Sequence, residues 1–390
     1  MASRTRTPQW RKIPVSLSEL CIDSTLRCGQ AFRWRKIGDE WTSTLNGRML
    51  SLKQDADHLH YKVTWPPPLP SSATNCCQDD DTERLLFRYF SLDMHLGTLY
   101  DKWSAADANF RRKAASLTGV RILSQNAWET LICFICSSNN NISRISQMVH
   151  KLCKHYGPPI GHAGEEVLHD FPTPESLVGA QVEGHLRELG FGYRAKYIAA
   201  TARVIALEKP VNWLESLRNP AHQGLQDRTP PADDCKSTYR DAHNALLSLA
   251  GVGPKVADCV CLMGLGWGNS VPVDTHVWQI AQRDYKFGKA KSKTFSKIMY
   301  DAVGDHFRGI WGDYAGWAHS VLFAADLGAF SKQDAASMSS AEESRTKVEE
   351  KKVEVVESRK RRAVKVEVKV EASEVEDSPK RRRTRRHQDA

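Results

Sequence analysis

The chain has 390 residues, and 41% of them are hydrophobic, which is enough for a sizeable core and for two or three domains. It contains no apolar run of about 18 residues and no apolar signal segment at its start, so we expect no membrane association. The formal net charge of +9 suits a polyanionic partner. Residues 331–390 contribute part of that charge, so the charge of residues 1–330 does not by itself establish DNA binding.

The ten cysteines lack the spacing of a disulfide framework. Cys133 and Cys136 lie in an apolar stretch, where a reduced intracellular protein uses cysteine as a small core residue. Alternatively, this Cys-x-x-Cys pair could supply half of a metal site. No second Cys or His pair stands at ligand spacing, so we expect no metal.

Residues 10–63 have aromatic and β-branched side chains interrupted by turn residues, which is typical of short β-strands. The expected strands are Phe32–Trp34, Trp41–Leu45, Met49–Leu52 and His58–Val63. Asn46-Gly47 predicts a tight hairpin, because both residues tolerate positive φ. We therefore expect a small antiparallel sheet in this segment.

From Thr82 onward the apolar residues repeat with a helical period. The first helix is indicated by Leu85, Leu86, Tyr89 and Phe90. Further helices are expected near residues 124–137, 142–155, 183–189, 193–208, 239–249, 254–264, 275–284, 294–302 and 313–326. Residues 66–81 are expected to form a polar linker, and the Pro- and Asp-rich residues 218–236 an inserted surface loop.

These patterns predict an α+β protein that is mostly α. We expect an N-terminal antiparallel β-sheet domain with flanking helices over residues 1–110 and an all-α body over residues 111–330. Apolar periodicity stops after about Phe330, and Ser, Ala, Lys and Glu dominate. Residues 331–390 are therefore expected to be a disordered basic tail.

The tail carries two dense basic clusters, Arg359–Arg362 and Lys380–Arg386. Such clusters indicate nuclear import through the import machinery or a nucleic-acid arm, and the plain alternative is a solubilising tail. We favour nuclear import, because both clusters flank an acidic spacer. The basic and hydroxylated first residues weakly resemble a transit peptide, so a mitochondrial pool stays open.

The segment from Leu249 to Ala257 lies between two helical patterns. Gly251 and Gly253 allow a tight turn with positive φ, and they let backbone N–H groups approach a phosphate with no Cβ in the way. Pro254 suits the first position of the second helix. This pattern is typical of a helix–hairpin–helix, which grips a DNA backbone without reading its sequence.

Lys255 stands one residue into that second helix, where it could also be a solvated lysine or a phosphate contact. Asp274 precedes a helical run, so it suits an N-cap whose free oxygen faces a cavity. A lysine and a carboxylate beside a DNA-binding hairpin indicate that a neutral amine attacks C1′ of a deoxyribose and displaces the base. The sugar would open to a Schiff base, and proton loss from C2′ would allow strand scission, with Asp274 stabilising the cationic sugar.

The hairpin, Lys255 and Asp274 resemble the helix–hairpin–helix DNA glycosylase superfamily. Seven further strings resemble the eukaryotic 8-oxoguanine DNA glycosylase/AP lyase family, in the family's order, between about residues 10 and 328. They are Gly29–Trp34, Ile135–Ile142, Leu189–Lys196, Val256–Met263, Val271–Asp274, Ala281–Tyr285 and Tyr314–Ala318. The resemblance implies a bifunctional repair enzyme that flips out and excises 8-oxoguanine opposite cytosine, then cleaves the strand by β-elimination.

The resemblance also implies how the base is held and removed. Lys255 is then the nucleophile and Asp274 its catalytic partner. Gly29 offers its backbone carbonyl to N7–H of the oxidised base, a hydrogen that guanine lacks. Cys259 and Phe323 sandwich the flipped base, and Cys259 shares a helix face with Lys255 because it lies four residues later.

Other residues implied by the resemblance contact the DNA around the lesion. Asn139 fills the gap left by the flipped base, and Tyr193 wedges into the stack. Arg144 and Arg194 bind the estranged cytosine. Taken singly, each has a plain alternative, such as a loop residue, a core aromatic residue or a solvated charge. Their common order along the chain favours the functional interpretation.

By the same resemblance, Pro272 and His276 line the product sugar and phosphate. The family has a glutamine after Tyr314–Ala318 that reads the Watson–Crick edge of the base, and this chain has His319. A neutral imidazole offers one donor and one acceptor in a different geometry, so we expect altered tolerance for other oxidised purines and a pH dependence below about 6.5. Ala250 replaces a frequent proline and should affect only turn rigidity.

No cysteine follows Cys261, so the iron–sulfur cluster of some related glycosylases is excluded. We expect no cofactor, although an ion between the hairpin and a phosphate stays open, and we expect a monomer that binds double-stranded DNA containing an oxidised purine. Three other functions stay open: a glycosylase for alkylated bases, a DNA-binding module in which Lys255 only touches phosphate, and a Schiff-base enzyme acting on a small metabolite.

Overall fold

The computed structural model describes residues 9–66, 80–222, 224–225, 237–287 and 296–327. All of them belong to the first of two units, residues 1–330 and 331–390. Most of the expected linker at 66–81 and of the expected loop at 218–236 lies outside the described residues. So does the whole tail with its two basic clusters. No helix in the described ranges is both long enough and apolar enough to cross a membrane.

The N-terminal sheet has five antiparallel strands in the order β1-β5-β4-β3-β2. They are β1 (Arg11–Pro14), β2 (Arg35–Ile37), β3 (Glu40–Leu45), β4 (Arg48–Gln54) and β5 (His58–Thr64). Asn46 (φ 48°) and Gly47 (φ 73°) form the turn between β3 and β4, so the hairpin prediction is confirmed. The strand expected at 32–34 was misplaced. Phe32 and Trp34 are buried in two different hydrophobic clusters, and β2 begins only at Arg35, directly after Trp34.

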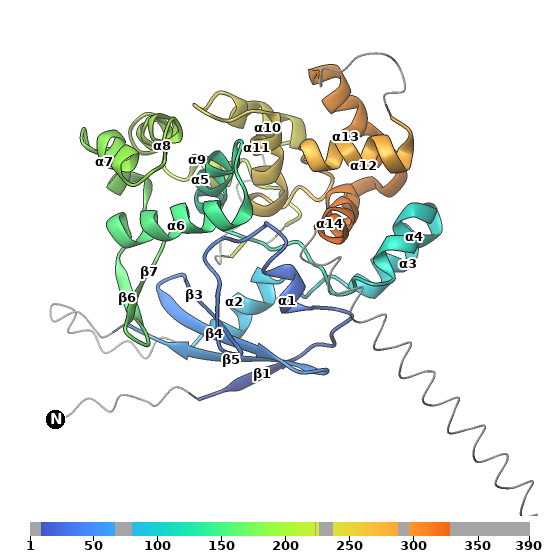
Figure 1. Ribbon diagram of the computed structural model, residues 1–390, viewed down its shortest axis with the longest axis horizontal. Helices are drawn as coiled ribbons and strands as arrows, with labels where there is room; N and C mark the ends of the chain where they lie inside the picture. Colours follow the sequence, from blue (N-terminus) through green and yellow to red (C-terminus); the bar gives the residue numbers. More distant parts are fainter. Residues whose placement is uncertain (1–8, 67–79, 223, 226–236, 288–295, 328–390) are drawn as a thin grey trace, which may run out of the picture. The chain divides into compact units, whose positions relative to one another are not determined.

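One face of the sheet is covered by two short helices, α1 (Ile22–Thr25) and α2 (Thr82–Tyr89) (Figure 1). In β5, Leu59, Tyr61 and Val63 are buried while the residues between them are partly exposed, as expected of a strand with one face against a core. The apolar residues of α2 pack against these side chains, which confirms the helical pattern that begins at Thr82.

The rest of the described chain is mainly helical, and the expected α+β class is confirmed (Figure 1). The helices are α3 (Leu96–Ala106), α4 (Ala108–Ala114), α5 (Ala127–Ser137), α6 (Ile142–Tyr156), α7 (Val182–Glu188), α8 (Arg194–Arg203), α9 (Trp213–Ser216), α10 (Tyr239–Leu247), α11 (Pro254–Cys259), α12 (Thr275–Tyr285), α13 (Lys297–Trp311) and α14 (Ala315–Asp326). Two 3₁₀ turns, η1 (Pro174–Leu177) and η4 (Gly312–Tyr314), and two π-helical turns, η2 (Val204–Glu208) and η3 (Val260–Gly264), extend or connect them.

Several elements of this body were not among the helices expected from the sequence. They are the helices α3, α4 and α9, the turn η1, and a hairpin of β6 (Pro159–Ala163) and β7 (Glu166–His169). Because of this hairpin, the prediction of an all-α body over residues 111–330 was wrong. The hairpin follows α6 and lies beside the N-terminal sheet (Figure 1). Its sequence contains Gly161 and Gly164 and few β-branched residues, so the sequence alone does not favour strands there.

Helix α5 runs through the centre of the helical core, and nine of its side chains are buried. Cys133 and Cys136 are among them. Burial raises the pKa of both thiols, that of Cys136 to about 12, so they are neutral core residues in the described structure. No group of three or more His, Cys, Asp or Glu residues that could hold a metal occurs in the described ranges.

A buried ion-pair cluster joins the sheet to the helical body. The guanidinium of Arg33 donates two hydrogen bonds of 2.8 Å to Glu129 and one of 3.1 Å to Asp170. Asp170 also accepts a 2.7 Å bond from the backbone N–H of Gly47, in the β3–β4 turn. Because Arg33 is buried, both carboxylates depend on it for charge compensation.

Candidate active site

The helix–hairpin–helix consists of α10, a short turn and α11. Gly251 has φ +76°, and a Cβ there would stand 2.6 Å from the ring of Tyr197, so both backbone and space require glycine. The pattern allowed a positive φ at both glycines, but Gly253 does not adopt one. It is the extended N-cap of α11 (φ −95°), with open space where a Cβ would be. The carbonyl of Ala250 accepts a 3.0 Å bond from Thr201 on α8, which ties down the turn.

Lys255 lies in the first turn of α11, after Pro254 as its first residue. Its Nζ donates a 3.1 Å hydrogen bond to Oγ of Ser137 and lies 4.7 Å from the centre of the Phe134 ring. Both partners belong to α5, which therefore holds the amine at the end of a buried helix. Ser137 had no expected role, although it lies within the family string from Ile135 to Ile142.

Asp274 caps α12, as expected. Its Oδ1 accepts bonds of 3.0 Å from the backbone N–H groups of His276 and Val277. Lys255 and Asp274 line the same cavities, but among the described residues they are bonded to different partners and form no ion pair with each other. The second carboxylate oxygen is thus left available to a positive charge that develops nearby.

Beyond Lys255, a partly enclosed pocket contains all the side chains expected to hold the base. It is lined by Cys28, Gly29, Gln30, Phe134, Lys255, Cys259, Met263, Pro272, Asp274, Val277, His319, Ser320 and Phe323. Gly29 has φ +83°, and a Cβ there would lie 3.2 Å from Ile142. Burial raises the pKa of the Cys259 thiol to about 12, so it can present a neutral sulfur surface to a flat ring. The structure brings these residues together, while their roles stay predictions.

His319 lies on α14 in the wall of this pocket and is 5% exposed. Neither ring nitrogen has a hydrogen-bond partner in the described structure. Burial lowers the pKa of His319 to about 4, and the carboxylate of Asp274 opposes this shift only in part. Burial therefore shifts the pH dependence expected below about 6.5 to lower pH, and this dependence stays a prediction.

A wider cleft opens on the other side of the same two residues. It is lined by Ser137, Ser138, Asn139, Asn140, Gly253, Pro254, Lys255, Val256, Val273, Asp274, Thr275, His276, Ser296, Lys297 and Tyr300. Asn139 is exposed and has φ +48° at the tip of the α5–α6 loop, and His276 is exposed in the first turn of α12. The end of the hairpin therefore lines the same cleft as Lys255 and Asp274.

Three expected DNA-contacting residues lie around the α5–α6 loop. Tyr193 is 48% exposed, and its hydroxyl donates a 3.1 Å bond to the carbonyl of Ser138. Arg144 is exposed in the first turn of α6. Arg194, in contrast, is 4% exposed and donates bonds to the carbonyls of Ser138 (3.1 Å) and Asn139 (3.0 Å). In the described structure Arg194 thus supports the loop that carries Asn139.

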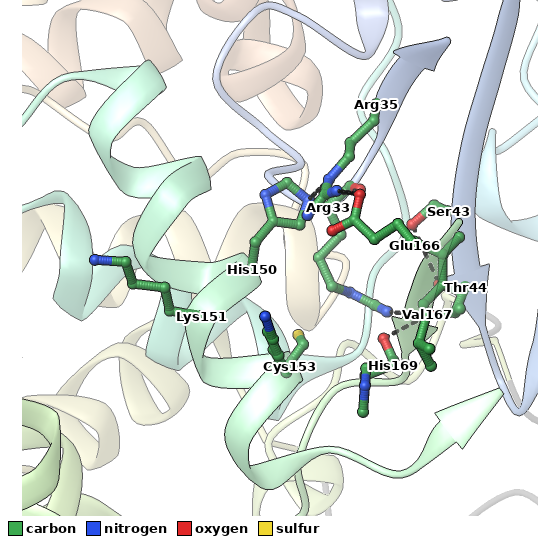
Figure 2. A pocket seen from close by; sticks show the side chains of 12 residues that line it. Arg33, Arg35, Ser43, Thr44, His150, Lys151, Cys153, Glu166, Val167 and His169 are labelled. Atoms are coloured by element: carbon green, nitrogen blue, oxygen red, sulfur yellow. Dashed lines mark hydrogen bonds and ion pairs between the residues drawn. The ribbon is translucent and has the colours of Figure 1, made fainter. Parts of the chain in front are cut away.

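A second charged cavity lies between α6, β3 and β7 (Figure 2). Arg35 donates a 2.9 Å bond to His150 and pairs with Glu166, and Arg33 is engaged in the cluster described above. This cavity shares no lining residue with the pocket or the cleft that contain Lys255. Because its arginines are paired internally, we assign it to the junction of sheet and helical body.

Comparisons with known proteins match this chain along most of its length. The family "8-oxoguanine DNA glycosylase, N-terminal domain" matches residues 12–131, and the "HhH-GPD superfamily base excision DNA repair protein" family matches residues 132–301. A relative named N-glycosylase/DNA lyase, from Saccharomyces cerevisiae, is 39% identical over 342 residues, covering 81% of this chain and 86% of the relative. The Arabidopsis thaliana relative named N-glycosylase/DNA lyase OGG1 is 35% identical over 330 residues, covering 83% and 82%. The structure of MBOgg1 in complex with a low-affinity DNA ligand has a TM-score of 0.63 at 27% identity, covering 82% of this chain and 98% of that one.

Proposed function

This chain belongs to the 8-oxoguanine DNA glycosylase family of helix–hairpin–helix base excision repair proteins, and we propose that its substrate is 8-oxoguanine paired with cytosine in double-stranded DNA. Members of this family are bifunctional N-glycosylase/DNA lyases, and the chain is an enzyme of DNA repair that binds DNA. One observation carries the assignment of the residues. Lys255 and Asp274 line both the partly enclosed pocket and the open cleft, so they stand where a flipped nucleotide would pass.

The proposed reaction begins with the amine of Lys255 in its neutral form. Its lone pair forms a bond to C1′ while the glycosidic bond breaks, and the electron pair of that bond leaves with the base, which takes up a proton. The free oxygen of Asp274 stabilises the positive charge on the sugar. The nitrogen lone pair then expels O4′ from C1′, O4′ takes up a proton, and the opened sugar is left as a Schiff base on Lys255. Loss of a proton from C2′ expels the 3′ phosphate by β-elimination.

Base recognition in this proposal depends on Gly29, Cys259 and Phe323. The backbone carbonyl of Gly29 accepts the N7–H of 8-oxoguanine, whereas the N7 lone pair of guanine would face that carbonyl without a hydrogen. The neutral thiol of Cys259 and the half-buried ring of Phe323 offer two flat contacts for the base. His319 is neutral and has two unsatisfied nitrogens, so it can offer one donor and one acceptor to the base edge.

The DNA-binding part of the proposal uses the hairpin and the α5–α6 loop. The backbone around Gly251 and Gly253 approaches a phosphate, and Asn139 occupies the gap in the duplex. Tyr193 and Arg144, both exposed, face the opposite strand. Arg194 reaches the estranged cytosine only if it exchanges its bonds to the loop carbonyls for bonds to the base. Pro272 and His276 border the product sugar and phosphate.

Borohydride trapping tests this function, because borohydride reduces a lysine Schiff base to a stable protein–DNA adduct. Wild type should form an adduct with a duplex containing 8-oxoguanine opposite cytosine, and Lys255→Gln should form none while still binding the duplex. Lys102→Gln, at an exposed position of α3, is the matched control and should trap like wild type. The same assay with guanine, alkylated bases and other opposite bases gives the lesion preference. Adduct formation by Lys255→Gln, or no preference for 8-oxoguanine, would contradict the proposal.

For localisation we propose nuclear import through Arg359–Arg362 and Lys380–Arg386, which lie outside the described residues. A fluorescent fusion of the full chain should accumulate in the nucleus, and replacing both clusters by glutamine should release it into the cytoplasm. Unchanged nuclear accumulation, or a mitochondrial signal, would favour a different targeting segment. We further propose that the chain acts as a monomer, which light scattering of the full chain measures directly.

A further inference from the structure

A buried carboxylate lies directly behind the candidate catalytic residues. Asp258 is on α11, three residues after Lys255, and is 1% exposed. It accepts hydrogen bonds from Tyr239 (2.5 Å), from Ser270 (2.8 Å) and from Tyr300. Burial raises the pKa of Asp258, and the donated hydrogen bonds act against that shift. Four segments of the chain therefore meet at one carboxylate.

The hydroxyl of Tyr300 makes a second contact that the other donors lack. Besides donating to Oδ2 of Asp258, it accepts a 3.3 Å hydrogen bond from the backbone N–H of Val273. Val273 immediately precedes Asp274, so only the backbone rotations at these two residues separate the anchored N–H from the Asp274 side chain. One hydroxyl on α13 thus connects the helix that carries Lys255 with the residue that precedes Asp274.

Ser270 holds the start of the same segment. Its hydroxyl lies 2.9 Å from the backbone carbonyl of Asp258 and 2.8 Å from the side-chain oxygen. Between Ser270 and Val273 the chain is buried, with Val271 fully inaccessible. The segment is therefore linked to Asp258 of α11 at two points, directly at Ser270 and through the hydroxyl of Tyr300 at Val273. The link through Tyr300 is the one nearer to Asp274.

We propose that Tyr300 is a positioning residue that sets the separation of Lys255 and Asp274 through its bonds to Asp258 and Val273. The proposal rests on the proposed function of those two residues. Lys255 and Asp274 make no direct contact, so their relative placement has to come from the backbone and its anchors. A misplacement of about 1 Å at a reacting centre lowers a rate by roughly 100-fold.

The test compares two variants that remove the same chemical group from the same carboxylate. Tyr300→Phe removes the donor to Asp258 and also the acceptor for Val273. Tyr239→Phe removes only a donor to Asp258, on the side facing α10. Each variant is assayed for thermal unfolding, for the affinity of an uncleavable lesion duplex, and for the single-turnover rate of base excision at saturating enzyme.

We expect Tyr300→Phe to lower the single-turnover rate by about 10- to 100-fold while the duplex affinity changes by less than about threefold. Tyr239→Phe should keep the rate within about threefold of wild type, although both variants lose a buried hydrogen bond. Equal rates for the two variants at a temperature where both are folded would overturn the proposal, because the carboxylate cluster would then only stabilise the fold. A rate loss in Tyr300→Phe that is matched by lost affinity would overturn it as well.

Two controls keep the outcomes separate. If Tyr300→Phe does not fold, Ser270→Ala replaces it in the test, because it releases the other end of the Ser270–Val273 segment. This variant should also lower the excision rate, and an unchanged rate would count against the proposal. If wild type itself fails to excise 8-oxoguanine, or Lys255→Gln retains excision, the proposed function is at fault and not the role of Tyr300.

Discussion

Because the imidazole of His319 is buried, we expect the free energy of unfolding to depend on pH by a predictable amount. An unfolded histidine titrates near 6.5, whereas burial lowers the pKa of His319 in the folded protein to about 4. Below about pH 6.5 the unfolded chain therefore binds a proton at His319 that the folded chain does not bind. The stability contributed by the neutral buried ring is complete above that pH and is lost as the pH falls towards 4. The total loss is about 3 kcal/mol.

His319→Gln removes this titration while keeping a side chain with one donor group and one acceptor group. Relative to wild type, the variant should gain about 2 kcal/mol in free energy of unfolding between about pH 7 and pH 5. Urea unfolding followed by tryptophan fluorescence measures this difference. His162→Gln, at an exposed position of β6, is the control and should show no such gain.

A pH-independent difference between His319→Gln and wild type would refute the reasoning, because the imidazole would then titrate alike in both states. The same burial has a consequence for activity. Between about pH 5 and 6.5 the excision rate of wild type should show no step that His319→Gln abolishes. Such a step would mean that His319 gains a charged or hydrated partner when DNA is bound.

Three substitutions test the rest of the site and its support. Arg33→Gln leaves the partly buried carboxylates of Glu129 and Asp170 without their cation, so it should lower the free energy of unfolding by about 3 kcal/mol in urea titrations. A loss below about 1 kcal/mol would contradict the role of this ion-pair cluster. Gly251→Ala puts a Cβ 2.6 Å from the Tyr197 ring and should weaken duplex binding by at least about tenfold in fluorescence anisotropy. Gly190→Ala is the control for backbone strain alone, because Gly190 has φ +91° but open space where the Cβ would be. Asp274→Asn keeps an N-cap oxygen, so the melting temperature of this variant should change little. Its single-turnover excision rate should fall by about 100-fold or more, because the amide carries no negative charge. An unchanged rate would show that Asp274 takes no part in the reaction.

The local signals in the sequence predicted the local structure well. Asn46-Gly47 gave a turn with two positive φ values, Pro254 opened α11, and Asp274 capped α12. Each of these depends on the residue itself or on neighbours within one turn. Cys259 and Lys255 share a pocket because a helix places residues four apart on one face.

The sequence failed where a signal was weak or ambiguous. The β6–β7 hairpin has little strand propensity and is held by its neighbours in space. Glycine allows a positive φ at both Gly251 and Gly253, but the sequence does not say which of them uses it, and Gly253 is an extended N-cap of α11.

The candidate catalytic lysine and carboxylate could be named from the sequence, but their surroundings could not. Ser137, which holds the amine of Lys255, is 118 positions away, and Tyr300 meets Asp258 across 42 positions. The apolar neighbours of His319 indicate a buried helix, but the lowering of its pKa to about 4 depends on packing that the local sequence does not specify. The sequence by itself determined the chemical groups, because side-chain chemistry and helix or turn signals are local. Only the tertiary structure decided their spacing, partners and proton affinities, because burial and long-range hydrogen bonds arise when distant segments pack together.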